Sequence, residues 1–323
     1  MLALNLSFLS AQATSEQSYS RAEQLMGCHF SITVTAENPT EAKRYLDLAI
    51  LEVKRIESLI SSWDEKSQTS EINRNAGVKP VKVDKELFKL IERSVSLSKL
   101  TDGDFDISFA SAEELRKAEE SIPESSDMGK IRKSARAIGF RNIILDKNAG
   151  TVFLKTKGMK IDFGAVGKGY ALDKIRSLLI AKGVSAGRVD ASGDICVWGK
   201  QLGGENWKVT VNDPFDQRKT LAVLPIPNGA VATSKKYHVS IKTDGQHHSH
   251  IIDPETGLSP KGLASVTVFA PVAEFADALA TSIFVMGRKA GLKLINQTPG
   301  TECLIVDESG AVFTSKNIKI NQP

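Results

Sequence analysis

The sequence has few cysteines, no long apolar run and no marked excess of either charge. Its 323 residues include only Cys28, Cys196 and Cys303, and this odd, widely spaced set matches neither a disulfide framework nor a zinc-binding motif. No segment reaches the roughly 20 apolar residues that span a bilayer. The 42 basic and 38 acidic residues give a formal net charge of only +4. These absences argue against a disulfide-stapled, membrane-spanning or nucleic acid-binding protein.

What is present fits an ordinary globular chain, with 41% hydrophobic and 25% charged residues. Apolar residues at helical spacing predict a long helix over 41–60, and a second helix is predicted over 85–100. A hairpin is predicted from 143–145 and 151–154, a short strand over 161–163, and many strands in the second half. Because helices and strands mix without strict βαβ alternation, the pattern favours an α+β fold over a doubly wound α/β fold.

The N-terminus predicts export. Leu2 to Leu9 is largely apolar, and Ser10-Ala11-Gln12-Ala13 follows as a cleavage site of the A-x-A type. We therefore expect a signal peptide and flexible leader over 1–24, a single domain over 25–323, and a periplasmic or cell-envelope location. The alternative interpretation of this segment is a disordered leader without export.

A glycine-rich turn lies between Asp162 and Tyr170, in the sequence Asp-Phe-Gly-Ala-Val-Gly-Lys-Gly-Tyr. A strand is predicted to end in Asp162, and a helix is predicted from about Tyr170 to Lys182. A helix N-terminus with Lys168 beside it suits a phosphate group. The turn is neither a Walker A loop nor a Rossmann fingerprint, and it can also be an ordinary connection between a strand and a helix.

Two further patterns carry polar groups in apolar or strand contexts. Asp277 and Thr281 lie four apart on an otherwise apolar helix, which suits a hard cation such as Mg²⁺ shared with substrate phosphates. The alternative is that both only satisfy their own helix. His250 precedes Ile251-Ile252-Asp253-Pro254 at the end of a predicted strand. A histidine there can act as a proton acceptor. A zinc site with His247 and His248 is a weaker alternative.

Together, these motifs resemble the ApbE family of FAD:protein FMN transferases, flavin transferases once called thiamine-biosynthesis lipoproteins. The resemblance covers essentially the whole chain after the leader. Its segments follow one another as Met26-Gly27, Ser70-Glu71-Ile72-Asn73, Gly103-Asp104-Phe105-Asp106, Asp162 to Asp173, Ser192-Gly193-Asp194, Ala232-Thr233-Ser234, His250 to Gly257 and Asp277 to Thr281.

The resemblance implies an ApbE-like α+β domain that binds extended FAD in a cleft between two lobes. It implies Mg²⁺ ligands at Asp277, Thr281 and the backbone carbonyl of Ala165, and a catalytic base at His250. It further implies flavin or adenine contacts at Met26, Trp63, Asp104, Phe105, Asp106, Asp162, Lys168 and Ile252.

The implied reaction is Mg²⁺-dependent transfer of FMN from FAD to a Thr or Ser hydroxyl of an exported target protein, with release of AMP. Two alternatives use the same site: an FAD pyrophosphatase with water as acceptor, and a non-catalytic exported FAD-binding protein. The chain departs from the family pattern at Ser192 and Lys235, where glycine is usual, and at Ile107-Ser108-Phe109.

Overall fold

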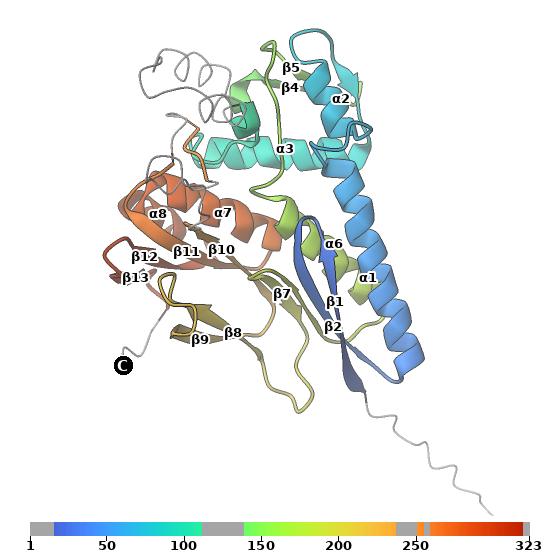
Figure 1. Cartoon of the computed structure of the whole chain (residues 1–323), viewed down its shortest axis with the longest axis vertical. Coiled ribbons are helices and arrows are strands. Elements are labelled where there is room, and N and C mark those ends of the chain that lie inside the picture. Colours follow the sequence, from blue (N-terminus) through green and yellow to red (C-terminus); the bar gives the residue numbers. More distant parts are fainter. Residues whose placement is uncertain (1–15, 112–138, 237–250, 255–258, 319–323) are drawn as a thin grey trace, which may run out of the picture.

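The structure is a computed structural model that describes residues 16–111, 139–236, 251–254 and 259–318. Its centre is an eight-stranded antiparallel sheet in the lower part of Figure 1. The strands follow one another across this sheet as β1 (Gln17–Leu25), β2 (Cys28–Ala36), β6 (Gly187–Ala191), β7 (Asp194–Trp198), β10 (Gly229–Lys235), β11 (Leu263–Ala270), β12 (Glu302–Asp307) and β13 (Val312–Thr314).

Helices cover one face of this sheet, and a hairpin covers part of the other. One face packs against helices α1 (Pro39–Ile60), α6 (Gly167–Ala181), α7 (Ala273–Met286) and α8 (Arg288–Asn296). The other packs against the hairpin of β8 (Trp207–Asn212) and β9 (Thr220–Ile226). Strand β7 shows the consequence, because its alternate side chains enter opposite cores: Trp198 lies in the helix-side core and Val197 in the hairpin-side core.

A second, smaller lobe stands above the sheet in Figure 1 and has its own hydrophobic core. It consists of α2 (Gln68–Arg74), α3 (Lys85–Leu100), the short helical turns Ile107–Phe109 and Phe140–Asn142, and a sheet in the order β3 (Val81–Lys82), β5 (Thr151–Leu154), β4 (Ile143–Asp146). Helix α1 joins the lobes, since Ala49 and Val53 lie in the sheet core and Ile56 and Ile60 in the upper core. The predicted α+β fold is confirmed.

The folded domain begins earlier than the sequence predicted. Strand β1 pairs with β2 along its whole length, from Gln17 opposite Ala36 to Leu25 opposite Cys28. Residues 17–24 therefore belong to the sheet, and the predicted boundary between leader and domain at residue 25 is wrong. The strand escaped detection because it lies at the sheet edge and buries little, so its sequence lacks an apolar alternation. The predicted signal peptide lies mostly outside the described residues and stays a prediction.

The predicted strand over 161–163 is also absent from this described segment. The backbone of Ile161 instead bonds to the side chain of Asn73, which accepts from its N–H at 2.8 Å and donates to its carbonyl at 3.0 Å. The N–H of Asp162 donates to the carbonyl of Ile107 at 2.8 Å. Because these partners satisfy the backbone, the segment needs no neighbouring strand.

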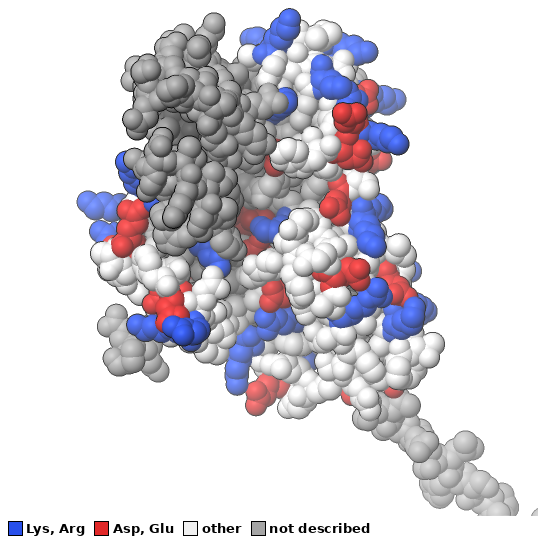
Figure 2. Space-filling view, in the orientation of Figure 1, with Lys and Arg blue, Asp and Glu red and all other residues white. Residues whose placement is uncertain are grey.

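Charged side chains are interspersed over the surface. On the face shown in Figure 2, basic and acidic residues alternate over the described part of the chain and no patch of one sign dominates. Among the described residues, no helix combines the length and hydrophobicity needed to cross a membrane.

Candidate active site

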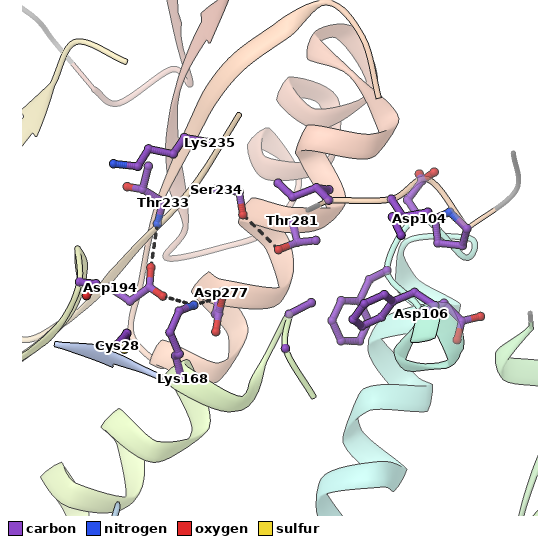
Figure 3. Close-up of a pocket in the computed structure, with 18 of the residues that line it drawn as sticks. Cys28, Asp104, Asp106, Lys168, Asp194, Thr233, Ser234, Lys235, Asp277 and Thr281 are labelled. Atoms are coloured by element: carbon purple, nitrogen blue, oxygen red, sulfur yellow. Dashed lines mark hydrogen bonds and ion pairs between the residues drawn. The ribbon is translucent and has the colours of Figure 1, made fainter. Parts of the chain in front are cut away.

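A cavity of about 500 Å³ lies between the two lobes. The upper lobe contributes the turn from Asp104 to Phe109, and the sheet lobe contributes the starts of β2 and β7, the end of β10 and one face of α7 (Figure 3). The chain from Gly164 to Lys168 passes between the lobes and forms part of the wall. Segments far apart in the sequence therefore meet at one site.

The loop before α6 brings a cation to this cavity. Helix α6 begins at Gly167, before the predicted start at Tyr170, and its N-cap residue Val166 offers no side-chain cap. Lys168 consequently lies in the first turn of the helix, with its side chain pointing into the cavity (Figure 3). The next residue, Gly169, meets α7 directly: an added Cβ would lie 2.3 Å from the carbonyl oxygen of Ala273. Only glycine permits this helix crossing.

Two buried carboxylates share the ammonium group of Lys168. Its Nζ lies 2.5 Å from Oδ2 of Asp194 and 3.5 Å from Oδ1 of Asp277. The other oxygen of Asp277 accepts the N–H of Gly169 at 3.0 Å, and that of Asp194 accepts the N–H of Thr233 at 3.0 Å. The cluster thus has two negative charges and one positive charge.

Burial and neighbouring charges act in opposite directions on the pKa values of this cluster. Burial raises the pKa of Asp277 to about 6, although the positive charge of Lys168 acts in the opposite direction. Burial acts to lower the pKa of Lys168, but Asp194 and Asp277 outweigh it and hold that pKa above its usual range. Lys168 is therefore a permanent cation, whereas Asp277 is a carboxylate whose charge is incompletely compensated.

A hydroxyl pair continues the cluster along α7. Thr281, one helical turn after Asp277, lies 3.0 Å from the hydroxyl of Ser234 in β10. The predicted placement of Asp277 and Thr281 on one face is confirmed, since both line the cavity. Ala165 lines the same cavity, so the three predicted metal ligands are together.

Two neighbouring aspartates in the upper wall, Asp104 and Asp106, have different surroundings. Asp106 lines the cavity, but its carboxylate points away from the centre in Figure 3. Its Oδ1 accepts from the N–H and hydroxyl of Ser108 at 2.8 and 2.7 Å, and its Oδ2 accepts the N–H of Phe140 at 2.6 Å. This carboxylate holds the turn itself. Asp104 and the buried Phe105 also line the cavity.

A second cavity of about 690 Å³ adjoins the first. Trp63 and Asp162 line it, whereas Gly164, two residues later, lines the first cavity. The carboxylate of Asp162 accepts the N–H of Gly164 at 2.6 Å and the hydroxyl of Ser62. Trp63 is 73% exposed, so it lies at the cavity wall and not in the core.

The remaining sequence-predicted site residues fall into three groups. Ile252 lines the first cavity. Met26 is half-buried at a hairpin turn where Met26 and Gly27 have φ of 50° and 70°. Its neighbour Gly27 lines the cavity. His250 lies outside the described residues, as do His247 and His248.

The sequence did not identify Asp194, Ser234 or Cys28 as site residues, yet all three line the cavity. The sequence could have indicated Asp194, because this aspartate follows the Ser192-Gly193 turn at the start of a strand. Among the described residues, no cluster of three or more His, Cys, Asp or Glu side chains is able to hold a metal ion. A metal here would therefore need hydroxyl, carbonyl or substrate oxygens beside Asp277.

Comparisons with known proteins find similar chains and a similar fold. The chain is 29% identical over 316 residues to an FAD:protein FMN transferase of Treponema pallidum, covering 93% of this chain and 87% of that protein. The crystal structure of an ApbE protein from Thermotoga maritima superposes with a TM-score of 0.85 at 32% identity, covering 93% of this chain and 97% of the other.

The flavin transferase ApbE from Vibrio cholerae has the same fold, with a TM-score of 0.81 at 21% identity over 93% of this chain and 98% of the other. The model of the ApbE family matches residues 26–305, from the hairpin turn beside the cavity to the middle of β12. With most of its length matched, this chain belongs to the ApbE family.

Proposed function

We propose that this chain is a Mg²⁺-dependent FAD:protein FMN transferase. Its membership of the ApbE family and its likeness to a protein named FAD:protein FMN transferase support the transfer of a flavin nucleotide. The observation that carries the proposal is the shared ammonium group: Asp277 and Asp194 are both buried, and Lys168 is their common partner. One negative charge is left over at the cavity wall.

The donor set fits Mg²⁺. Asp277 offers a carboxylate, Thr281 a hydroxyl and Ala165 a backbone carbonyl, and all three line the cavity. Magnesium prefers such hard oxygen ligands and completes its shell with water and substrate phosphates. Asp194 and Asp277 share the single charge of Lys168, so an added cation at this cluster would favour the binding of a pyrophosphate. Charge and ligand chemistry thus point to the same ion.

The two adjoining cavities suit an extended dinucleotide. Lys168 at the start of α6 acts as a point charge for a phosphate, and the helix N-terminus adds to this attraction. Trp63 in the second cavity offers exposed aromatic surface to a ring of the nucleotide. We assign Met26, Asp104, Asp106, Asp162 and Ile252 to the walls around the nucleotide, with Asp106 acting through the turn that it holds.

The reaction is a phosphoryl transfer in which an acceptor hydroxyl of a target protein attacks the phosphorus on the FMN side of the pyrophosphate. The bond to the AMP oxygen breaks, and AMP leaves as FMN becomes a phosphate ester of the target. His250 takes the proton of the attacking hydroxyl. When bound, Mg²⁺ neutralises charge on the phosphates. The acceptor is a Thr or Ser side chain of an exported protein, and the signal-like N-terminus supports an envelope location for this chain as well.

The decisive experiment incubates the chain with FAD and Mg²⁺, alone and with a candidate acceptor protein, and analyses AMP, FMN and protein by mass. Transfer predicts AMP release together with an acceptor heavier by one FMN unit. AMP and free FMN without labelled acceptor would instead support an FAD pyrophosphatase. Tight FAD binding without turnover in either mixture would support an FAD-binding protein and overturn the proposal.

A further inference from the structure

Helix α7, which carries Asp277 and Thr281, has no N-terminal cap of its own. Its N-cap residue is Val272, whose apolar side chain makes no cap bond. The first N–H groups of a helix need partners from outside it. Asp173 of α6 supplies them, because its Oδ1 accepts the N–H of Ala273 at 3.0 Å and its Oδ2 accepts the N–H of Glu274 at 2.8 Å. A cap that ordinarily comes from the helix's own chain start comes here from another helix.

Asp173 is itself held in place. Arg176, one turn later on α6, lies 3.2 Å from its carboxylate and donates to the carbonyl of Pro271 at 3.0 Å. Arg176 therefore links α6 to the residues that lead into α7. Glu274 extends the connection to the upper lobe, since its carboxylate accepts from Nε and an amino group of Arg93 in α3 at 2.7 and 2.9 Å.

Two residues of α6 that lie one turn apart, Gly169 and Asp173, hold the start of α7. Gly169 lies against Ala273 and donates its N–H to Asp277. Asp173 binds the first N–H groups of α7. These two contacts set both the position of α7 along its axis and its rotation. Asp277 lies one turn and Thr281 two turns from Ala273, so any movement at the helix start moves both.

From this geometry we propose that Asp173 is a positioning residue for the metal-binding pair, acting through α7. It does not line either of the two cavities described above, so its proposed role is indirect. The inference rests on the proposed function, in which Asp277 and Thr281 hold Mg²⁺. Outer residues that orient metal ligands commonly contribute roughly 10- to 100-fold to metal affinity.

The test measures binding of ADP, a diphosphate stand-in for the pyrophosphate of FAD, by calorimetry with and without Mg²⁺. In the wild type, Mg²⁺ should tighten ADP binding. Asp173→Ala should reduce this Mg²⁺-dependent gain by roughly 10- to 100-fold, and Asp173→Asn should fall between, because it keeps one acceptor oxygen. Asn38→Ala is the matched control: it removes the cap of α1, which accepts the N–H of Glu41 at 2.9 Å far from the cavity.

A second variant separates positioning from simple helix stability. Val272→Ser in the Asp173→Ala chain gives α7 a cap of its own, at a position whose extended backbone suits one. This double variant should regain the wild-type melting temperature, while its Mg²⁺-dependent gain in ADP affinity should stay low. If it regains both, Asp173 is only a helix cap and the inference is overturned. If the wild type itself shows no gain from Mg²⁺, the proposed metal site fails instead.

Discussion

At the scale of single residues, Asp277 links the proposed metal site to pH. Its pKa, raised by burial to about 6, lies above the value near 3.9 of an unfolded chain. Between these two pH values, the folded, metal-free protein therefore keeps a proton on Asp277 that the unfolded chain has lost. The contribution of this group to stability is full below about pH 4 and declines as pH rises toward 6. Mg²⁺ needs the ionised carboxylate, so protons compete with the ion below pH 6.

We predict that the Mg²⁺-dependent gain in ADP affinity falls by up to about tenfold per pH unit below pH 6 and is level above it. Calorimetry across this range measures the effect. In Asp277→Asn the gain should be small at every pH, because the titrating ligand is gone. A wild-type gain that does not change between about pH 5 and pH 8 would remove Asp277 from the metal site.

Asp106 and Asp104 offer a matched pair for separating fold from binding. Asp106→Ala leaves three hydrogen-bond donors around a buried site without their acceptor. We expect it to lower the free energy of unfolding by at least about 2 kcal/mol. Asp104→Ala should cost less than about 1 kcal/mol and should weaken FAD binding. Chemical denaturation and FAD titration check both, and equal losses of stability would contradict the division of roles.

His250 is proposed as the base on the sequence alone. We predict that His250→Asn keeps FAD binding but slows FMN transfer by roughly 10²-fold, the usual scale for loss of a general base. Single-turnover measurements with saturating FAD isolate this step from binding. Equal turnover per bound FAD in the variant and the wild type would leave His250 without a catalytic role.

At the scale of elements, α6 and α7 cross at Gly169. Its added Cβ would meet backbone atoms of Ala273, which cannot move without shifting α7. We predict that Gly169→Ala costs about 1–3 kcal/mol of stability and removes most of the Mg²⁺-dependent ADP affinity. Gly167→Ala is the control, since its Cβ would meet the flexible end of the Ile60 side chain at 2.9 Å. Equal effects of the two substitutions would show that the crossing is not critical.

The elements also show which features of the fold and the site the sequence could predict. The helices over 41–60 and 85–100 were predictable because each buries one regular apolar face. Asp277 and Thr281 were predictable as a pair because four-residue spacing fixes their relation within one helix. The partners of these residues were not predictable. Asp194 contacts Lys168, and Ser234 contacts Thr281, because the folded sheet brings β7 and β10 beside the helices. The spacing of residues along the chain does not predict such long-range contacts.

At the scale of the whole molecule, the N-terminal strand bears on both stability and export. Strand β1 pairs with β2 along its whole length, and Arg21 binds Asp47 of α1 at 2.7 Å. Removing residues 1–24 would delete these contacts and leave β2 as a bare edge, which invites pairing with other chains. Cleavage at the predicted site after Ala13 would leave a chain that starts at Thr14, before the strand begins.

We therefore predict that a chain starting at Thr14 matches the full chain in melting temperature and FAD cleavage. A chain starting at Leu25 should lose several kcal/mol, on the order of 0.2–1 kcal/mol for each cross-strand pair removed, and should aggregate at lower temperature. Light scattering during heating and AMP release compare the two. If the shorter chain were equally stable, β1 would be dispensable. The same chains separate folding from export, because mass analysis of protein from the cell envelope should find Thr14 as the first residue, and an intact N-terminus there would rule out the predicted cleavage.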